Sequence, residues 1–175
     1  MDAAKKYFLN PGYIFITKED YEIETILGSC VSLCLFDNIH KVYGMNHYVI
    51  FANPGNMDKS HSGRYGKDSI KHLISEMLSM GAELKNIKAY IVGGAGHPVL
   101  GEAVGNDNIK IAKDMLAKAK IEIIKEDTGG NLGRKLLFLT KNAEIKVYYI
   151  NSEKTSFDNI KDGDKNGKNK GINYR

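Results

Sequence analysis

Apolar residues alternate with polar ones, or run together over a few positions, in several short segments of the chain. Such spacing is typical of β-strands, whose side chains point to opposite faces in turn. The predicted strands cover residues 13–17, 21–27, 30–36, 42–51, 87–92, 121–125, 135–140 and 144–150. We expect the third and fourth of these strands to pair as a hairpin across the Asp37-Asn38 turn, and the last two to form a second hairpin.

Two other stretches have the spacing of helices. Residues 66–80 carry one apolar stripe and are followed by Gly81, which predicts a helix that ends there. The stripe consists of Ile70, Leu73, Ile74, Met77 and Leu78. A second helix is predicted from about Asn106, whose side chain can cap it. Strands that alternate with two helices indicate an α/β fold of mixed β-sheet.

The length of 175 residues suits a single domain, which we place at residues 1–150. Residues 151–175 shift to Asn, Lys, Gly and Asp with few apolar residues, and we expect this tail to be disordered. The formal charge of +4 is modest, and the tail holds six Lys or Arg against four Asp or Glu. No basic stripe remains in the body, so nucleic acid is not an expected partner.

No apolar run is long enough to cross a bilayer, and the first residues lack the apolar segment of a signal peptide. We therefore expect no membrane insertion and a soluble, cytoplasmic protein. Cys30 and Cys34 are four residues apart on one predicted strand, about 13 Å, which is too far for a disulfide between them. Two free thiols fit a reducing compartment.

Cys30 is the candidate nucleophile. Leu27, Gly28 and Ser29 form a tight turn that presents it at the start of a strand. Gly28 would permit a sharp or positive-φ turn, and backbone N–H groups there could stabilise an oxyanion. The alternative is a buried structural thiol, since free cysteines are among the most buried residues. One face of the strand is predicted to be core and carries Val31, Leu33 and Leu35.

A cysteine nucleophile usually needs an imidazole that takes up the thiol proton. If the strands at 30–36 and 42–51 pair, His47 comes to lie beside Cys30. Thr25, just before the turn, could orient the imidazole through a hydrogen bond. Each residue also has a structural interpretation: a lone histidine on a strand is commonly structural, and threonine is a good strand residue.

Other motifs indicate no metal and no cofactor. The chain has neither a C-x-x-C pair nor an H-E-x-x-H motif. The glycines at 93–96 lack the following Gly-Lys-Ser/Thr of a phosphate loop, and crowding of the backbone explains them better. The segment 162–167 imitates a calcium loop, but Asn173 stands where that loop requires Glu. The remaining histidines are weaker site candidates: His40, His61, His72 and His97.

Several motifs, in order along residues 13–150, resemble the CheD family of bacterial chemotaxis. They read LGSCVSLCLFD, MNHYVI, RYGKDSIKHLISEMLSMGA, VGGAG, GEAVGNDNIKIAKDML and DTGGNLGRKLLFL. The resemblance implies a layered α/β sandwich similar to the catalytic domain of cytotoxic necrotizing factor toxins. It also implies a Cys-His-Thr site in which Cys30 is the nucleophile and His47 the base. Thr25 is the preferred third residue, next to Glu24.

The residues alone indicate acyl transfer by a thiol and do not separate a deamidase from a transglutaminase or a peptidase. The resemblance implies a protein-glutamine glutaminase that deamidates methyl-accepting chemotaxis receptors without a cofactor. It also implies binding to a CheC-like phosphatase. A different interpretation is a non-catalytic regulator that binds this phosphatase and the receptors.

Overall fold

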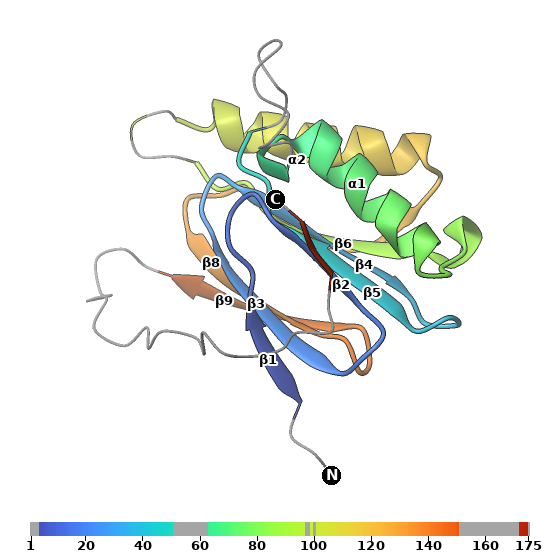
Figure 1. Cartoon of the computed structure of the whole chain (residues 1–175). Coiled ribbons are helices and arrows are strands. Elements are labelled where there is room, and N and C mark those ends of the chain that lie inside the picture. Colours follow the sequence, from blue (N-terminus) through green and yellow to red (C-terminus); the bar gives the residue numbers. More distant parts are fainter. Residues whose placement is uncertain (1–3, 51–62, 97–98, 100, 151–171, 175) are drawn as a thin grey trace.

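The computed structural model describes residues 4–50, 63–96, 99, 101–150 and 172–174. Two α-helices, a six-stranded sheet and a four-stranded sheet form three layers, with the larger sheet in the middle (Figure 1). The predicted α/β layered sandwich with two main helices is confirmed. The expected likeness to the toxin catalytic domain stays a prediction.

The larger sheet has the strand order β10-β2-β5-β4-β6-β7. Its strands are β2 (Ile14–Thr17), β4 (Val31–Asp37), β5 (Val42–Asn46), β6 (Lys88–Gly93), β7 (Glu122–Thr128) and β10 (Ile172–Tyr174). β4 lies near the centre and pairs antiparallel with both β5 and β6, while β6 and β7 are parallel. The predicted hairpin of the strand after Cys30 with the following strand is therefore confirmed.

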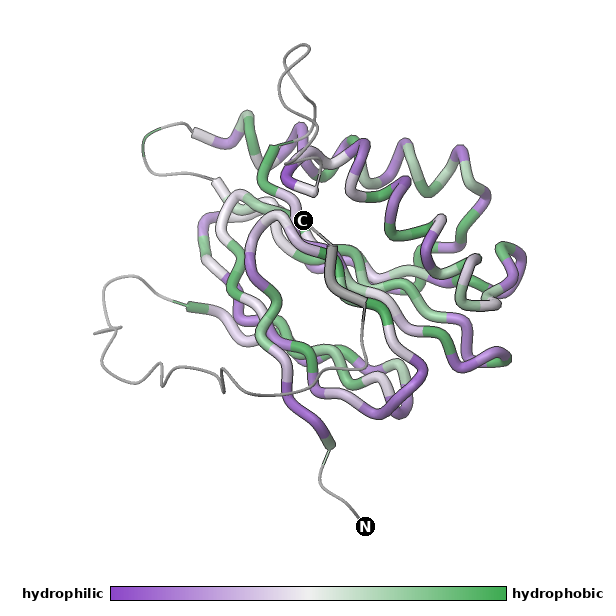
Figure 2. The backbone as a smooth tube through the Cα atoms, in the orientation of Figure 1, coloured by the Kyte–Doolittle hydropathy of each residue, from purple (hydrophilic) through white to green (hydrophobic). Residues whose placement is uncertain are grey.

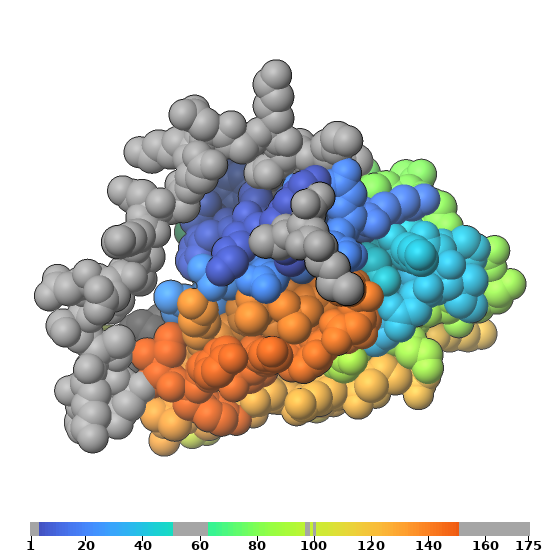
Figure 3. Space-filling view, turned by 90° about the horizontal axis from the view of Figure 1, so that it is seen from below, coloured from blue at the N-terminus to red at the C-terminus, as the bar shows by residue number. Residues whose placement is uncertain are grey.

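The smaller sheet covers the face of the larger sheet that lies opposite the helices, and Figure 3 shows it from that side. Its order is β1-β3-β8-β9. The strands are β1 (Lys5–Phe8), β3 (Tyr21–Leu27), β8 (Gly133–Leu139) and β9 (Glu144–Ile150). β8 and β9 form the predicted second hairpin, and β1 runs parallel to β3 at the sheet edge.

Helices cover the outer face of the larger sheet (Figure 1). They are α1 (Gly66–Ser79) and α2 (Ala103–Lys118), with a short 3-10 helix η2 (Leu84–Asn86) between them. The predicted stripe of α1 is wrong at Leu78, which is 40% exposed and does not belong to the core that the other residues of the stripe contact. α2 begins before Asn106, directly after the positive-φ turn at Gly101, so Asn106 does not cap it. Neither helix of the described chain could span a membrane.

β4 is buried on both faces. Val31, Leu33 and Leu35 pack in the core between the larger sheet and the helices. Cys34 and Phe36 point the other way, into a second core between the two sheets. The alternation predicted only one apolar face as core, but the middle layer of a three-layer sandwich has two. Hydrophobic residues accordingly concentrate in the strands and on the sides of the helices that face the sheet (Figure 2).

Part of the chain lies outside the described residues. The predicted polar loop at 53–64 does so up to position 62, as do His61, His97 and the segment 162–167. Most of the predicted tail, residues 151–171 and 175, does so as well. Within that tail, residues 172–174 form β10 and pair antiparallel with β2, so these three residues depart from the predicted disorder.

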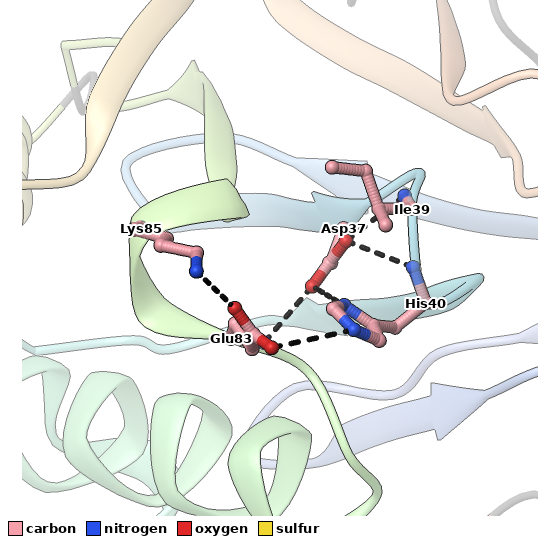
Figure 4. A network of polar contacts seen from close by, with 5 residues as sticks. All are labelled: Asp37, Ile39, His40, Glu83 and Lys85. Atoms are coloured by element: carbon pink, nitrogen blue, oxygen red, sulfur yellow. Dashed lines mark hydrogen bonds and ion pairs between the residues drawn. The ribbon is translucent and has the colours of Figure 1, made fainter.

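A polar network closes the β4–β5 turn (Figure 4). The buried carboxylate of Asp37 accepts hydrogen bonds from the backbone N–H groups of Ile39, His40 and Glu83 at 2.9–3.0 Å, and its Oδ2 lies 2.8 Å from Nδ1 of His40. Glu83 also pairs with Lys85 at the surface. Burial alone would raise the pKa of Asp37, but these donors outweigh it and hold the pKa below its ordinary value.

We expect Asp37→Asn to lower the free energy of unfolding by about 2 kcal/mol at pH 7, because an amide cannot accept from every donor around it. Since the carboxylate pKa is lower in the folded protein, this contribution is complete above the unfolded pKa and disappears as the pH falls through the folded value. Urea denaturation at pH 7 and at pH 2–3 measures both parts. Glu83→Gln, which alters only a surface side chain, is the matched control and should change stability far less. Equal stability of Asp37→Asn and the parent protein at pH 7 would contradict the prediction.

Candidate active site

Thr25, Cys30 and His47 all come from strand ends on the inner side of the two sheets. Thr25 is an inward-facing residue of β3, Cys30 directly precedes β4, and His47 directly follows β5. The Val31–Tyr48 bridge continues the β4–β5 register, so that His47 lies across from Ser32. Cys30 is therefore a diagonal neighbour of His47, and such positions lie roughly 7–8 Å apart between Cα atoms. The thiol of Cys30 packs against the core between the sheets.

β5 ends at Asn46, earlier than the predicted strand at 42–51, because the side chain of Asn46 takes over the pairing. Its Oδ1 accepts from the backbone N–H of Leu33 at 2.8 Å, and its Nδ2 donates to Ser69 of α1 at 3.0 Å. The next backbone N–H, that of His47, leaves the ladder and donates to Tyr13 at 3.1 Å. His47 is consequently held by the β2 side of the sheet as well as by β5.

A hydrogen-bond relay fixes the imidazole. The hydroxyl of Thr25 donates to the carbonyl of Leu9 at 2.7 Å, and its Oγ1 lies 2.8 Å from Nδ1 of His47. Since the hydroxyl hydrogen is engaged by Leu9, Nδ1 must carry the hydrogen in the bond to Thr25. Nε2 is then an unprotonated acceptor, and it is buried without a hydrogen-bond partner in the described chain. The structure thus brings Thr25 and His47 together. The imidazole keeps one unprotonated nitrogen without a partner, which can act as a base.

Burial shifts the pKa values of Cys30 and His47 in the directions that favour their neutral forms. It lowers the pKa of His47 to about 4. Burial also raises the pKa of the Cys30 thiol, although the Cys30 N–H and the Arg64 guanidinium act in the opposite direction. A thiol with a raised pKa beside an imidazole with a lowered pKa retains its proton. Both shifts favour a neutral thiol and a neutral imidazole over a thiolate–imidazolium pair in the free protein.

We expect the rate constant for alkylation of Cys30 by iodoacetamide to rise about tenfold per pH unit from pH 6 to about pH 8.5, because only the thiolate reacts. Mass spectrometry of the intact protein measures this rate. Cys30→Ala gives the background from Cys34, which is buried. A plateau near neutral pH would instead reveal an ion pair with His47.

The glycine requirement at the turn lies at Gly93 rather than at Gly28. Gly28 has no positive φ, and a Cβ there would meet nothing within 4 Å, so the predicted need for glycine is wrong. Gly93 has φ +115°, and its Cβ would lie 2.3 Å from the carbonyl oxygen of Cys30. Gly94 also has a positive φ. The prediction that backbone crowding explains the glycine-rich stretch at 93–96 is confirmed at these two positions.

The turn before β4 has its carbonyl groups engaged and its N–H groups available. The backbone N–H of Ala95 donates to Gly28 at 2.9 Å, and that of Gly94 donates to Cys30 at 2.8 Å. Within the described residues, no backbone carbonyl accepts from the N–H groups of Ser29 and Cys30, and the N–H of Cys30 is directed toward its own thiol. Ser29 and Cys30 are only partly buried. These two N–H groups are the donors that the sequence suggested for an oxyanion.

Sequence reasoning did not find Asn108. This residue of α2 is fully buried, and its Nδ2 donates to the carbonyl groups of Ser29 at 2.9 Å and Val49 at 3.0 Å. A signal was present, because Asn108 lies four residues before Ala112 and so shares the buried stripe of α2 with Leu116. A polar residue on such a stripe requires buried partners.

A glycine-rich loop between β7 and β8 lies beside this end of the sandwich. Gly129 donates through its backbone to Gly93 at 3.0 Å, and Gly96 donates to Gly130 at 2.7 Å. The guanidinium of Arg134 holds the loop through bonds to Asp127 and to two loop carbonyls. A hollow of about 460 Å³ opens over the loop. Its lining comprises Glu126, Asp127, Thr128, Gly129, Gly130, Asn131, Leu132, Arg134 and Tyr149.

The other described histidines lie apart from this group. His40 is in the β4–β5 turn with Asp37, and His72 lies on α1 near Glu76. Across the described residues, no three His, Cys, Asp or Glu side chains gather in a way that could hold a metal ion.

A comparison with protein families identifies the family to which this chain belongs. The sequence profile described as CheD chemotactic sensory transduction matches residues 52–149, more than half of the chain. The chain belongs to the CheD family. The profile match begins after Cys30 and His47, so it says nothing of these two residues.

Individual CheD relatives extend the similarity to most of the chain. A protein of Sulfurimonas denitrificans is 34% identical over 161 residues, which is 90% of this chain and all of that protein. Proteins of Rhodospirillum rubrum and Borrelia turicatae are 35% and 36% identical, over 87% and 82% of this chain and 86% and 88% of their own lengths. All three bear the name "Probable chemoreceptor glutamine deamidase CheD".

Proposed function

We propose that the chain is a chemoreceptor glutamine deamidase that hydrolyses side-chain amides of glutamines on methyl-accepting chemotaxis proteins. The bare Nε2 of His47, oriented by Thr25 and lying diagonally from the thiol of Cys30, is the observation that carries this proposal. It supplies a base and a nucleophile for acyl transfer. The names of the CheD relatives supply the substrate class.

The first half-reaction would form a thioester. As Sγ of Cys30 attacks the carboxamide carbon of glutamine, its proton passes to Nε2 of His47, while the bond from Nδ1 to Thr25 keeps the ring in place. The negative charge that develops on the amide oxygen is stabilised by backbone N–H groups of Ser29 and Cys30. His47 then gives the proton to the amide nitrogen, the C–N bond breaks and ammonia leaves.

The second half-reaction would release glutamate. A water molecule attacks the thioester carbon and gives one proton to Nε2 of His47. The C–S bond breaks, the proton returns to Sγ of Cys30, and the substrate carries a carboxyl group. The groups that take part belong to the protein, the substrate and water, so the proposed mechanism uses no metal and no cofactor.

Two further proposals concern the setting of the reaction. We place the protein in the cytoplasm, which fits the two free thiols, Cys30 and Cys34. We also propose a CheC-like phosphatase as a binding partner, which is supported by the resemblance of the sequence motifs. The non-catalytic regulator is not adopted, because a buried base with an unpartnered nitrogen beside a thiol serves catalysis rather than binding.

The test is to incubate the protein with the cytoplasmic fragment of a methyl-accepting receptor. We expect ammonia release in equal amount to the conversion of particular glutamines to glutamates, which peptide mass spectrometry maps. Protein pretreated with iodoacetamide is the matched control and should be inactive, because Cys34 is buried and Cys30 is the accessible thiol. A receptor that binds the untreated protein but releases no ammonia would contradict the proposal and favour the regulator.

A further inference from the structure

The side-chain amide of Asn108 is held in one orientation. Its Nδ2 contacts two carbonyl oxygens, those of Ser29 and Val49. Both partners can only accept hydrogen bonds, so the nitrogen must face them and the oxygen must face away. Oδ1 is buried without a hydrogen-bond partner in the described chain. Burying an oxygen in this way costs free energy, which indicates that the two donated bonds matter more than the one left unmade.

The bond to Ser29 fixes the direction of the next N–H group. A trans peptide is planar, and its C=O and N–H bonds point to opposite sides. Asn108 draws the Ser29 carbonyl toward α2, so the N–H of Cys30 in the same peptide points away from the helix. The preceding peptide is fixed in the same manner, because the carbonyl of Gly28 accepts from Ala95. Both N–H groups thus point away from the partners that hold their peptides, and they belong to residues that are only partly buried.

Asn108 is a firm anchor for this purpose. It lies within α2, is fully buried, and its own carbonyl accepts a hydrogen bond from the hydroxyl of Tyr48. Its second bond reaches Val49, two residues after His47. One amide therefore ties the segment that carries the nucleophile to the segment that carries the base.

We infer that Asn108 is a positioning residue that sets the oxyanion donor of the site by orienting the Ser29–Cys30 peptide. The inference rests on the proposed deamidase function. In this inference, a side chain of α2 holds the Cys30 N–H group in the direction that stabilises an oxyanion. Without that side chain, the N–H group would rotate with a partly exposed turn.

The test compares deamidation with alkylation in Asn108→Leu, which keeps the side-chain shape and removes the donor. We expect kcat for receptor deamidation to fall by about 10- to 100-fold with KM changed less than about twofold, because an oxyanion donor acts in the transition state. The alkylation rate of Cys30 by iodoacetamide should stay within about twofold, since that displacement forms no oxyanion. Equal loss of both rates, or unchanged kcat, would overturn the inference.

Two additional variants separate this role from stability. Asn108→Ala removes the same donor without adding apolar volume and should show the same split between the two rates. Leu116→Ala, on the same buried stripe of α2, should lower the thermal midpoint without changing kcat below that midpoint. If both Asn108 variants fail to fold, Asn108 is a stabilising residue and the inference is wrong. Absence of ammonia release by the unmodified protein would instead contradict the proposed function itself.

Discussion

Receptor deamidation is expected to disappear in Cys30→Ala, with a loss of at least about 10⁴-fold in kcat. In this variant no side chain of the described site can replace Sγ as the nucleophile. His47 then has no thiol from which to take a proton. The fold should survive, because Cys30 is only partly buried and alanine fits the same backbone. Ammonia release and circular dichroism measure the two parts.

Cys34→Ala is the matched control for this substitution. Cys34 lies on the same strand face but is fully buried, and burial strongly raises the pKa of its thiol. The control should lose stability by about 1 kcal/mol through the small cavity and keep its turnover. Retained deamidation in Cys30→Ala, or its loss in a folded Cys34→Ala, would contradict the assignment of the nucleophile.

In His47→Gln, kcat is expected to fall by about 10³- to 10⁴-fold, because glutamine can bond to Thr25 but cannot transfer the proton. Thr25→Val leaves the imidazole in place without its partner and should reduce kcat less. The rate of ammonia release at a saturating concentration of receptor fragment gives kcat for both variants and shows which one loses more. If Thr25→Val were as inactive as His47→Gln, the hydroxyl would have to do more than orient the ring.

The same His47→Gln substitution should make the protein less sensitive to acid. An unfolded histidine takes up a proton below about pH 6.5, whereas folded His47 does so only near pH 4. Between these values the unfolded state binds more protons, so the stability of the parent protein falls as the pH decreases. This loss in the free energy of unfolding is on the order of 3 kcal/mol in the parent protein, and it is absent from the variant. Urea denaturation at pH 7 and pH 4.5 checks the prediction, and identical pH dependence of the two proteins would contradict it.

The sequence predicted the strands and helices better than their assembly. Alternation identified β3, β8 and β9, since each has one apolar face. It could not show that the strands divide into two sheets, because pairing between β3 and β8 joins residues over a hundred positions apart. The backbone N–H of Tyr21 and the hydroxyl of Thr140, 119 residues apart, form one such contact. Sheet membership depends on this packing and not on local spacing.

The placement of the candidate site residues was predictable where it follows strand pairing, but not where it depends on the helices. His47 and Cys30 could be placed together because they flank one hairpin, and Thr25 because it precedes the same turn. Asn108 reaches the turn from α2, 79 residues after Ser29 in the chain, and no local pattern gives that distance. The importance of Gly28 was overestimated, because the close approach occurs at Gly93, where β6 meets the carbonyl of Cys30.

The burial of β4 on both faces has a consequence for hydrogen exchange. A strand with no solvent-facing side chain and hydrogen-bonded neighbours on both edges exposes its amides only when the whole sandwich opens. Its amide hydrogens should therefore exchange with deuterium at the slowest rates in the molecule. Cys30, the proposed nucleophile, directly precedes the part of the chain that we expect to open last, so its orientation should persist through local fluctuations of the surrounding loops.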